Sequence, residues 1–204
     1  MFNYISNTIL YFIAMTLPKL AGLILLPLYS LYITPADFGI YGYINTIVIF
    51  IAVLSSLALN AFYLRYYPLN EDKKEINGTI FWFMCLWNIF LLATGLTITY
   101  VFWDFAEVSF DYMPYMPIAL VGQFFNSMEI IPMRTYRIRG EAKYYLYRVL
   151  AKCILTILFA YVFVVHFRLG ALGRLYSDFL NAMPATSSTS PFSSIMSTRR
   201  SIRS

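Results

Sequence analysis

Charged side chains are scarce in this 204-residue chain, because Asp, Glu, Lys and Arg together make up only 12% of it. Soluble domains carry about 25% charged residues. Apolar residues make up 60% of the sequence and aromatic residues 19%. This balance excludes an ordinary soluble domain and predicts a membrane protein.

The usual signatures of enzymes and metalloproteins are also missing. The sequence contains no Gly-rich phosphate loop, no metal-ligand cluster, no Cys-His pair and no nucleophile elbow. Its single histidine, His166, is expected at the surface, and Cys85 and Cys153 lie in apolar runs where cysteine usually packs rather than pairs. We therefore expect no enzymatic activity, no catalytic residue, no cofactor and no metal.

Long runs without charge are the main positive feature. Lys19 is the only charged residue between positions 2 and 36, and no charge occurs in 38–64 or 76–103. Each of these runs exceeds the roughly 20 residues that a helix needs to cross a bilayer. Shorter apolar runs follow at 112–128 and 149–166, the second with Lys152 one turn from its start, and a sixth begins at Leu169 and stops near Met183. The amino terminus lacks the basic region and cleavage site of a signal peptide, so we expect the first apolar run to stay in the protein as a helix.

These runs predict an all-α fold, a polytopic transmembrane bundle with five complete spanning helices and part of a sixth. The five helices are expected at about 9–32, 39–62, 79–103, 112–133 and 146–167, and the sixth begins near residue 169. The short "TPADFG" segment connects the first two, with Thr34 as helix N-cap, Pro35 at the first helical position and Asp37 in the first turn.

The charges between the runs predict an orientation. Basic residues gather in 65–74 and 134–148, whereas the connection at 103–112 carries Asp104, Glu107 and Asp111. The positive-inside rule then places the amino terminus in the cytoplasm and the protein in the cell inner membrane. The basic and aromatic segment 134–148 is interpreted as contacting lipid phosphates, and we expect no nucleic-acid partner.

The composition changes abruptly after Met183. Residues 1–183 are predicted to form the transmembrane bundle, and residues 184–204 a tail rich in Ser and Thr. One interpretation is a disordered tail. The other is a reading frame that breaks inside the sixth helix, and the shortness of the last apolar run favours it. We accordingly expect a truncated form of a longer protein.

Four segments, taken in order, resemble the oligosaccharide flippase (Wzx-type, polysaccharide biosynthesis) family. They are "PKLAG" at 18–22, "LLPLYSLYITPADFGIYGY" at 25–43, "LSSLALNAFYLRYY" at 54–67 and "GALGRL" at 170–175. The resemblance implies twelve spanning helices in two six-helix bundles around a central cavity. It also implies alternating-access export of a polyprenyl-pyrophosphate-linked oligosaccharide for O-antigen or capsule synthesis.

The partners implied by this resemblance are membrane lipids, the lipid-linked oligosaccharide and other polysaccharide assembly proteins. Two alternatives stay open. A drug exporter of the same superfamily would be expected to have an acidic cavity, whereas a membrane-embedded polysaccharide polymerase would be expected to have a large outer loop.

Lys19 is the strongest individual signal for a site. It lies near the middle of the first run, and an unpaired ammonium at that depth is costly in lipid. It is predicted to face a cavity and meet the pyrophosphate of the substrate. The alternative is that the spanning segment begins later and Lys19 lies at the interface.

The remaining candidates are polar residues on the second and fourth runs. Asn45 and Asn60 share one face of the second helix, where helix packing competes with cavity lining. Arg65 is either a positive-inside anchor or part of a cytoplasmic mouth. Glu129 is either an ion path or a partner of a nearby arginine, Arg134. The candidate substrate-binding residues are thus Lys19, Asn45, Asn60, Arg65 and Gln123, and the candidate ion-coupling residue is Glu129.

Overall fold

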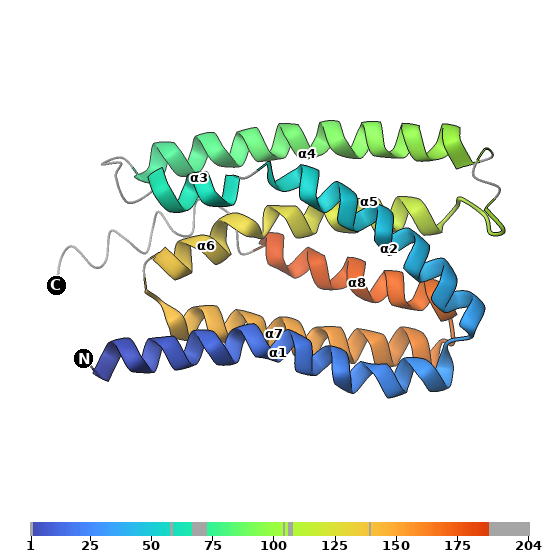
Figure 1. Cartoon of the computed structure of the whole chain (residues 1–204), viewed down its shortest axis with the longest axis horizontal. Coiled ribbons are helices and arrows are strands. Elements are labelled where there is room, and N and C mark those ends of the chain that lie inside the picture. The colour runs from blue at the N-terminus through green and yellow to red at the C-terminus, as the bar shows by residue number, and fades with distance from the viewer. Residues whose placement is uncertain are drawn as a thin grey trace.

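A computed structural model describes residues 2–57, 59–66, 73–103, 105, 108–138 and 140–187. Every regular element in this part of the chain is helical, which confirms the predicted all-α class. Figure 1 shows the helices running roughly along one common axis. In chain order they are α1 (Phe2–Tyr32), α2 (Pro35–Ser56), α3 (Leu59–Tyr66), α4 (Lys73–Trp103), α5 (Tyr115–Met128), α6 (Ile130–Ile138), α7 (Ala142–Ala160), the π-helix η1 (Tyr161–His166) and α8 (Gly170–Ser187).

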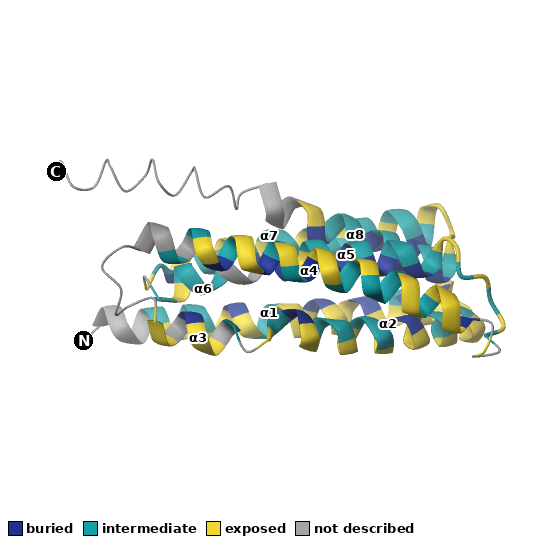
Figure 2. Ribbon diagram, turned by 90° about the horizontal axis from the view of Figure 1, so that it is seen from above, coloured by how far each residue is buried: buried dark blue, intermediate teal, exposed yellow. Residues whose placement is uncertain are grey.

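Among the described residues, four helical stretches are long and apolar enough to cross a membrane, namely Asn7–Tyr32, Pro35–Tyr63, Gly78–Trp103 and Ala142–His166. Many large apolar residues of these stretches are exposed, and Figure 2 shows exposed residues along the ribbons of α1, α2 and α4. Phe12, Leu31 and Tyr100 are 70%, 78% and 68% exposed. A surface of this kind suits lipid, which is as apolar as these side chains.

The expected five complete spans and partial sixth are not confirmed. The segment predicted as one helix at 112–133 is divided into α5 and α6, because the backbone N–H of Glu129 bonds to the carbonyl of Asn126, three residues back. With 14 residues, α5 is about 21 Å long, which is shorter than the roughly 30 Å hydrocarbon core.

The second predicted span is also interrupted. The helix α2 ends at Ser56, and Leu57 takes a left-handed conformation with φ of 37° before α3 begins. The predicted end of the bundle at Met183 differs as well, because α8 continues to Ser187, four residues further. The rest of the predicted tail, 188–204, and the predicted outer residues Asp104 and Glu107 lie outside the described residues.

The turn between α1 and α2 has the predicted local structure. Thr34 is the N-cap of α2, its Oγ accepts a hydrogen bond from the backbone N–H of Asp37 at 3.2 Å, and Pro35 occupies the first helical position. The helix therefore begins at Pro35, four residues before the expected start at 39. A hydroxyl N-cap and a proline with a fixed φ together set this helix start locally.

After this turn α1 and α2 pack against different partners. The buried residues Leu25 and Tyr29 of α1 form a cluster with Ala160 of α7 and Val164 of η1. The buried Ile44 of α2 instead belongs to a cluster with α5 and α8. The two amino-terminal helices therefore diverge along the bundle. The helix α8 contacts both α7, which packs on α1, and α5, which packs on α2, and it lies between them (Figure 1).

Candidate functional site

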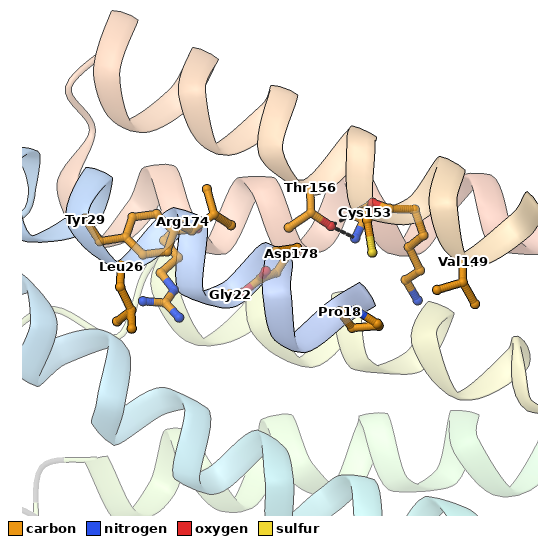
Figure 3. Close-up of a pocket in the computed structure, with 13 residues that line it drawn as sticks. Pro18, Gly22, Leu26, Tyr29, Val149, Cys153, Thr156, Arg174 and Asp178 are labelled. Atoms are coloured by element: carbon orange, nitrogen blue, oxygen red, sulfur yellow. Dashed lines mark hydrogen bonds between the residues drawn. The ribbon is translucent and has the colours of Figure 1, made fainter. Parts of the chain in front are cut away.

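A cavity of about 440 Å³ lies between α1, α7 and α8 (Figure 3). The wall from α1 is mostly apolar, with Leu25 and Leu26 among its members. The wall from α7 and α8 carries most of the polar and charged groups, which are Lys152, Thr156, Arg174, Asp178 and Asn181. A cavity with convergent polar groups on one side and apolar groups on the other is the usual form of a ligand site.

The polar wall of α8 follows from helical spacing. Arg174, Asp178 and Asn181 are four and three residues apart, so one face of the helix presents all three to the cavity. The neighbouring stripe of the same helix, which includes Ala171 and Leu175, is buried against other helices. Because α8 packs closely on α5 with this apolar stripe, its polar stripe is directed between α1 and α7.

Two tyrosine rings hold the guanidinium of Arg174. Its Cζ lies 3.8 Å from the ring centroid of Tyr41 on α2 and 4.3 Å from that of Tyr29 on α1. Contacts of this kind are attractive because the ring faces carry negative charge. The described residues place no carboxylate within ion-pair distance of this guanidinium. Arg174 therefore links the two diverging helices through its contacts with both rings.

Two hydrogen bonds join polar groups of the cavity lining to neighbouring helices. The hydroxyl of Tyr41 donates to Oδ2 of Asp178 at 2.9 Å. The amide of Asn181 donates to Oγ1 of Thr156 at 2.6 Å, as Figure 3 shows. These bonds join α2 to α8 and α8 to α7. Among the described residues, Oδ1 of Asn181 has no hydrogen-bond partner although it is buried.

Lys152 forms an ion pair with Glu129 and donates a second hydrogen bond, of 3.2 Å, to Oδ1 of Asn126. Glu129 is the residue at the break between α5 and α6, and only 9% of its side chain is exposed. Lys152 is more open, with 31% of its side chain exposed, and it lines the cavity. The ion pair thus fixes the helix break to α7 at the edge of the cavity.

The residues predicted from the sequence do not converge on this cavity. Lys19 is exposed on α1, although its neighbour Pro18 lines the wall. Arg65 is exposed in the last turn of α3, and Asn45 is half-buried on α2. The side chain of Asn60 lies outside the described residues.

Two predicted residues occupy defined interior positions. Gln123 is buried on α5 and lines a different, much smaller cavity together with Ser55 and Asn88. Glu129 is at the edge of the main cavity, where it pairs with Lys152. Of the predicted residues whose side chains the structure describes, Glu129 is the one that forms an ion pair with a residue of the cavity lining.

Arg174, Asp178 and Asn181 line the cavity although none of them is predicted as a site residue from the sequence, and Lys152 is predicted only as a charge near the start of an apolar run. A signal for them was present. Arg174 and Asp178 lie inside the sixth apolar run with helical spacing, and an ionisable residue in such a run is a functional candidate by default. A charge within an apolar run therefore indicates Arg174 and Asp178 as site candidates just as it indicates Lys19.

Comparison of the chain with known protein families, with curated proteins and with solved structures finds no match.

Proposed function

We propose that this chain forms the membrane bundle of an exporter for a polyprenyl-diphosphate-linked oligosaccharide. The observation that carries the proposal is the cavity, where Lys152 and Arg174 are held among long apolar helices. Cationic side chains are expensive within a bilayer, and those that occur there mark substrate or ion pathways. A diphosphate is an anion suited to such a site, and the sequence resemblance to oligosaccharide flippases supports the same substrate class.

Arg174 is the residue best suited to contact the diphosphate. Its planar guanidinium presents several N–H donors, and a phosphate accepts them in pairs. The guanidinium lies over the rings of Tyr29 and Tyr41 and lines the cavity, where a ligand can reach it. Polar groups such as Thr156 and Asn181 supply hydrogen bonds for the sugar portion, while the polyprenyl chain stays in lipid.

We also propose which helices cross the membrane. We place α5 with α6, and α8, across the membrane beside the four apolar stretches, because Glu129 is buried in the bundle and Arg174 and Asp178 line its cavity. A broken helix is tolerated at membrane depth where it is buried in protein or lines a cavity. Export then proceeds by alternating access in the cell inner membrane, with the amino terminus in the cytoplasm.

Labelling of single cysteines tests this orientation. After Cys85 and Cys153 are replaced, a cysteine at Val108 should react in intact cells with an impermeant thiol reagent added outside. A cysteine at Gly140 should react only after the cells are permeabilised, because the basic segment around it is placed inside. Reaction at Gly140 in intact cells would reverse the orientation.

Binding of a polyprenyl diphosphate to the chain in lipid nanodiscs tests the function. We expect saturable binding of the radiolabelled diphosphate and no binding of the corresponding polyprenyl alcohol. Arg174→Gln should weaken the affinity by about 10-fold to 100-fold, because a charge-assisted contact contributes about 1.5–3 kcal/mol. Lys143→Gln is the matched control, since it removes an exposed basic residue outside the cavity and should leave the affinity unchanged. Equal affinities of the Arg174 variant and the unmodified chain would contradict the proposal.

Export of organic cations is a second candidate function. The observation that favours it is the carboxylate of Asp178 beside two tyrosine rings, a combination that attracts cations. The guanidinium of Arg174 already occupies the faces of those rings, so a cationic ligand would have to displace it. Saturable binding of tetraphenylphosphonium that increases in Arg174→Gln would identify this activity instead.

A further inference from the structure

A second, small cavity lies where α2, α4 and α5 meet. Its volume is about 10 Å³, and its lining is apolar except for three side chains, Ser55 from α2, Asn88 from α4 and Gln123 from α5. These side chains belong to residues that are 1%, 3% and 8% exposed. The main cavity uses none of them. Three buried polar groups from three helices therefore converge on one small space.

Within the described part of the chain these groups have almost no hydrogen-bond partners. Oγ of Ser55 has none, although it is fully buried. Nδ2 of Asn88 donates to the carbonyl of Met84 at 2.9 Å, and neither Oδ1 of Asn88 nor the amide of Gln123 forms a hydrogen bond to a described residue. Buried polar groups without partners are rare in native proteins, and each one costs free energy.

We propose that one water molecule occupies this cavity and bridges Ser55, Asn88 and Gln123. The volume is close to that of a single water-sized sphere, and an internal water typically makes about three hydrogen bonds. The three side chains supply both donors and acceptors, as water requires. A hard metal ion takes about six or more oxygen ligands, and the rest of this lining is apolar.

This water has a structural consequence for the break in the second span. Ser55 lies in the last turn of α2, which stops at Ser56. Nε1 of Trp87 on α4 already donates to the carbonyl of Leu54 at 3.0 Å, in the same turn. The water adds a second polar link, so the end of α2 is held on α4 and α5 at the point where α3 departs.

The direction in which Ser55→Ala changes the stability of the chain tests the proposal. If the cavity is dry, Ser55→Ala removes an unsatisfied hydroxyl and should lower the unfolding equilibrium constant of the chain in detergent micelles. If the water is present, the same change removes one of its partners and should raise that constant about fivefold. Ser127→Ala is the matched control, because this serine is equally buried but bonds to the Phe124 carbonyl of its own helix at 2.7 Å. The control should change the constant less than twofold.

A double-mutant cycle separates the water from a purely local effect at Ser55. Gln123→Met keeps the shape of the side chain, and the double variant Ser55→Ala/Gln123→Met should be more stable than the sum of the single effects predicts. Each single substitution removes a partner of the same water, so the second removal is expected to cost less than the first. Strict additivity, or a lower unfolding constant in Ser55→Ala, would overturn the proposal. Stabilisation that appears only with sodium ions would also overturn it, by replacing the water with a cation.

Discussion

Gly170→Ala is expected to destabilise the fold by about 3 kcal/mol or more. Gly170 begins α8 with φ of +56°, a conformation that residues with a side chain rarely adopt. A Cβ at this position would lie 2.7 Å from Oδ2 of Asp37 and 2.8 Å from its Cγ. The substitution therefore combines backbone strain with a clash, and the clash displaces either α8 or the turn between α1 and α2.

The contact also explains what the "TPADFG" segment does in this fold. Asp37 is held in the first turn of α2, where Oγ1 of Thr34 donates to its Oδ2 at 2.7 Å. Its carboxylate then packs against the first residue of α8, where the free N–H groups of a helix favour negative charge. Two of the segments that resemble the flippase family are thus in contact, although they lie far apart in the sequence.

Thermal unfolding in detergent measures this effect, and two variants separate its causes. Gly140→Ala is the matched control, because Gly140 has φ of +70° but no atom within 4 Å of an added Cβ. It should cost only about 1 kcal/mol of backbone strain. The double variant Asp37→Ala/Gly170→Ala should recover most of the stability that Gly170→Ala loses beyond the loss in Gly140→Ala, because it lacks the clashing carboxylate. Equal effects of Gly140→Ala and Gly170→Ala would show that the packing of Asp37 on α8 is unimportant.

Lys152→Met should destabilise the chain by about 3 kcal/mol, because it leaves the carboxylate of Glu129 without its counterion at a buried position. Glu129→Gln should cost less. The remaining ammonium of Lys152 is 31% exposed toward the cavity and keeps its 3.2 Å hydrogen bond to Asn126. We therefore expect Lys152→Met to lower the stability more than Glu129→Gln does, because Glu129 is the more buried member of the pair.

The double variant Glu129→Gln/Lys152→Met provides the decisive comparison. It removes both charges together, so its stability should lie within about 1 kcal/mol of the unmodified chain. Chemical unfolding in mixed micelles measures all three variants on one scale. Lys143→Met is the control for the loss of an exposed lysine on the same helix. Additive effects of the two single substitutions would show that the ion pair does not hold the break between α5 and α6 to α7.

The sequence by itself determined the features that depend on local properties. The lengths of the apolar runs predicted the helical class, because a helix satisfies its backbone polar groups within one segment. The helix start at Thr34 and Pro35 was equally predictable, since a side-chain cap and a fixed φ act over a few residues. The break at Glu129 was not predicted, because a run of suitable composition conceals a change in the backbone hydrogen-bond pattern.

Only the tertiary structure decided which polar residues meet. Lys19 and Arg174 both interrupt apolar runs, and nothing in their local sequence distinguishes them. The packing of α1 on α7 leaves Lys19 exposed, whereas the packing of α8 on α5 carries Arg174 between Tyr29 and Tyr41. Helical periodicity assigns a residue to a face of its own helix, but the partner of that face depends on how distant helices fit together. The position of the cavity is therefore a property of helix packing, which the order of residues along each run does not specify.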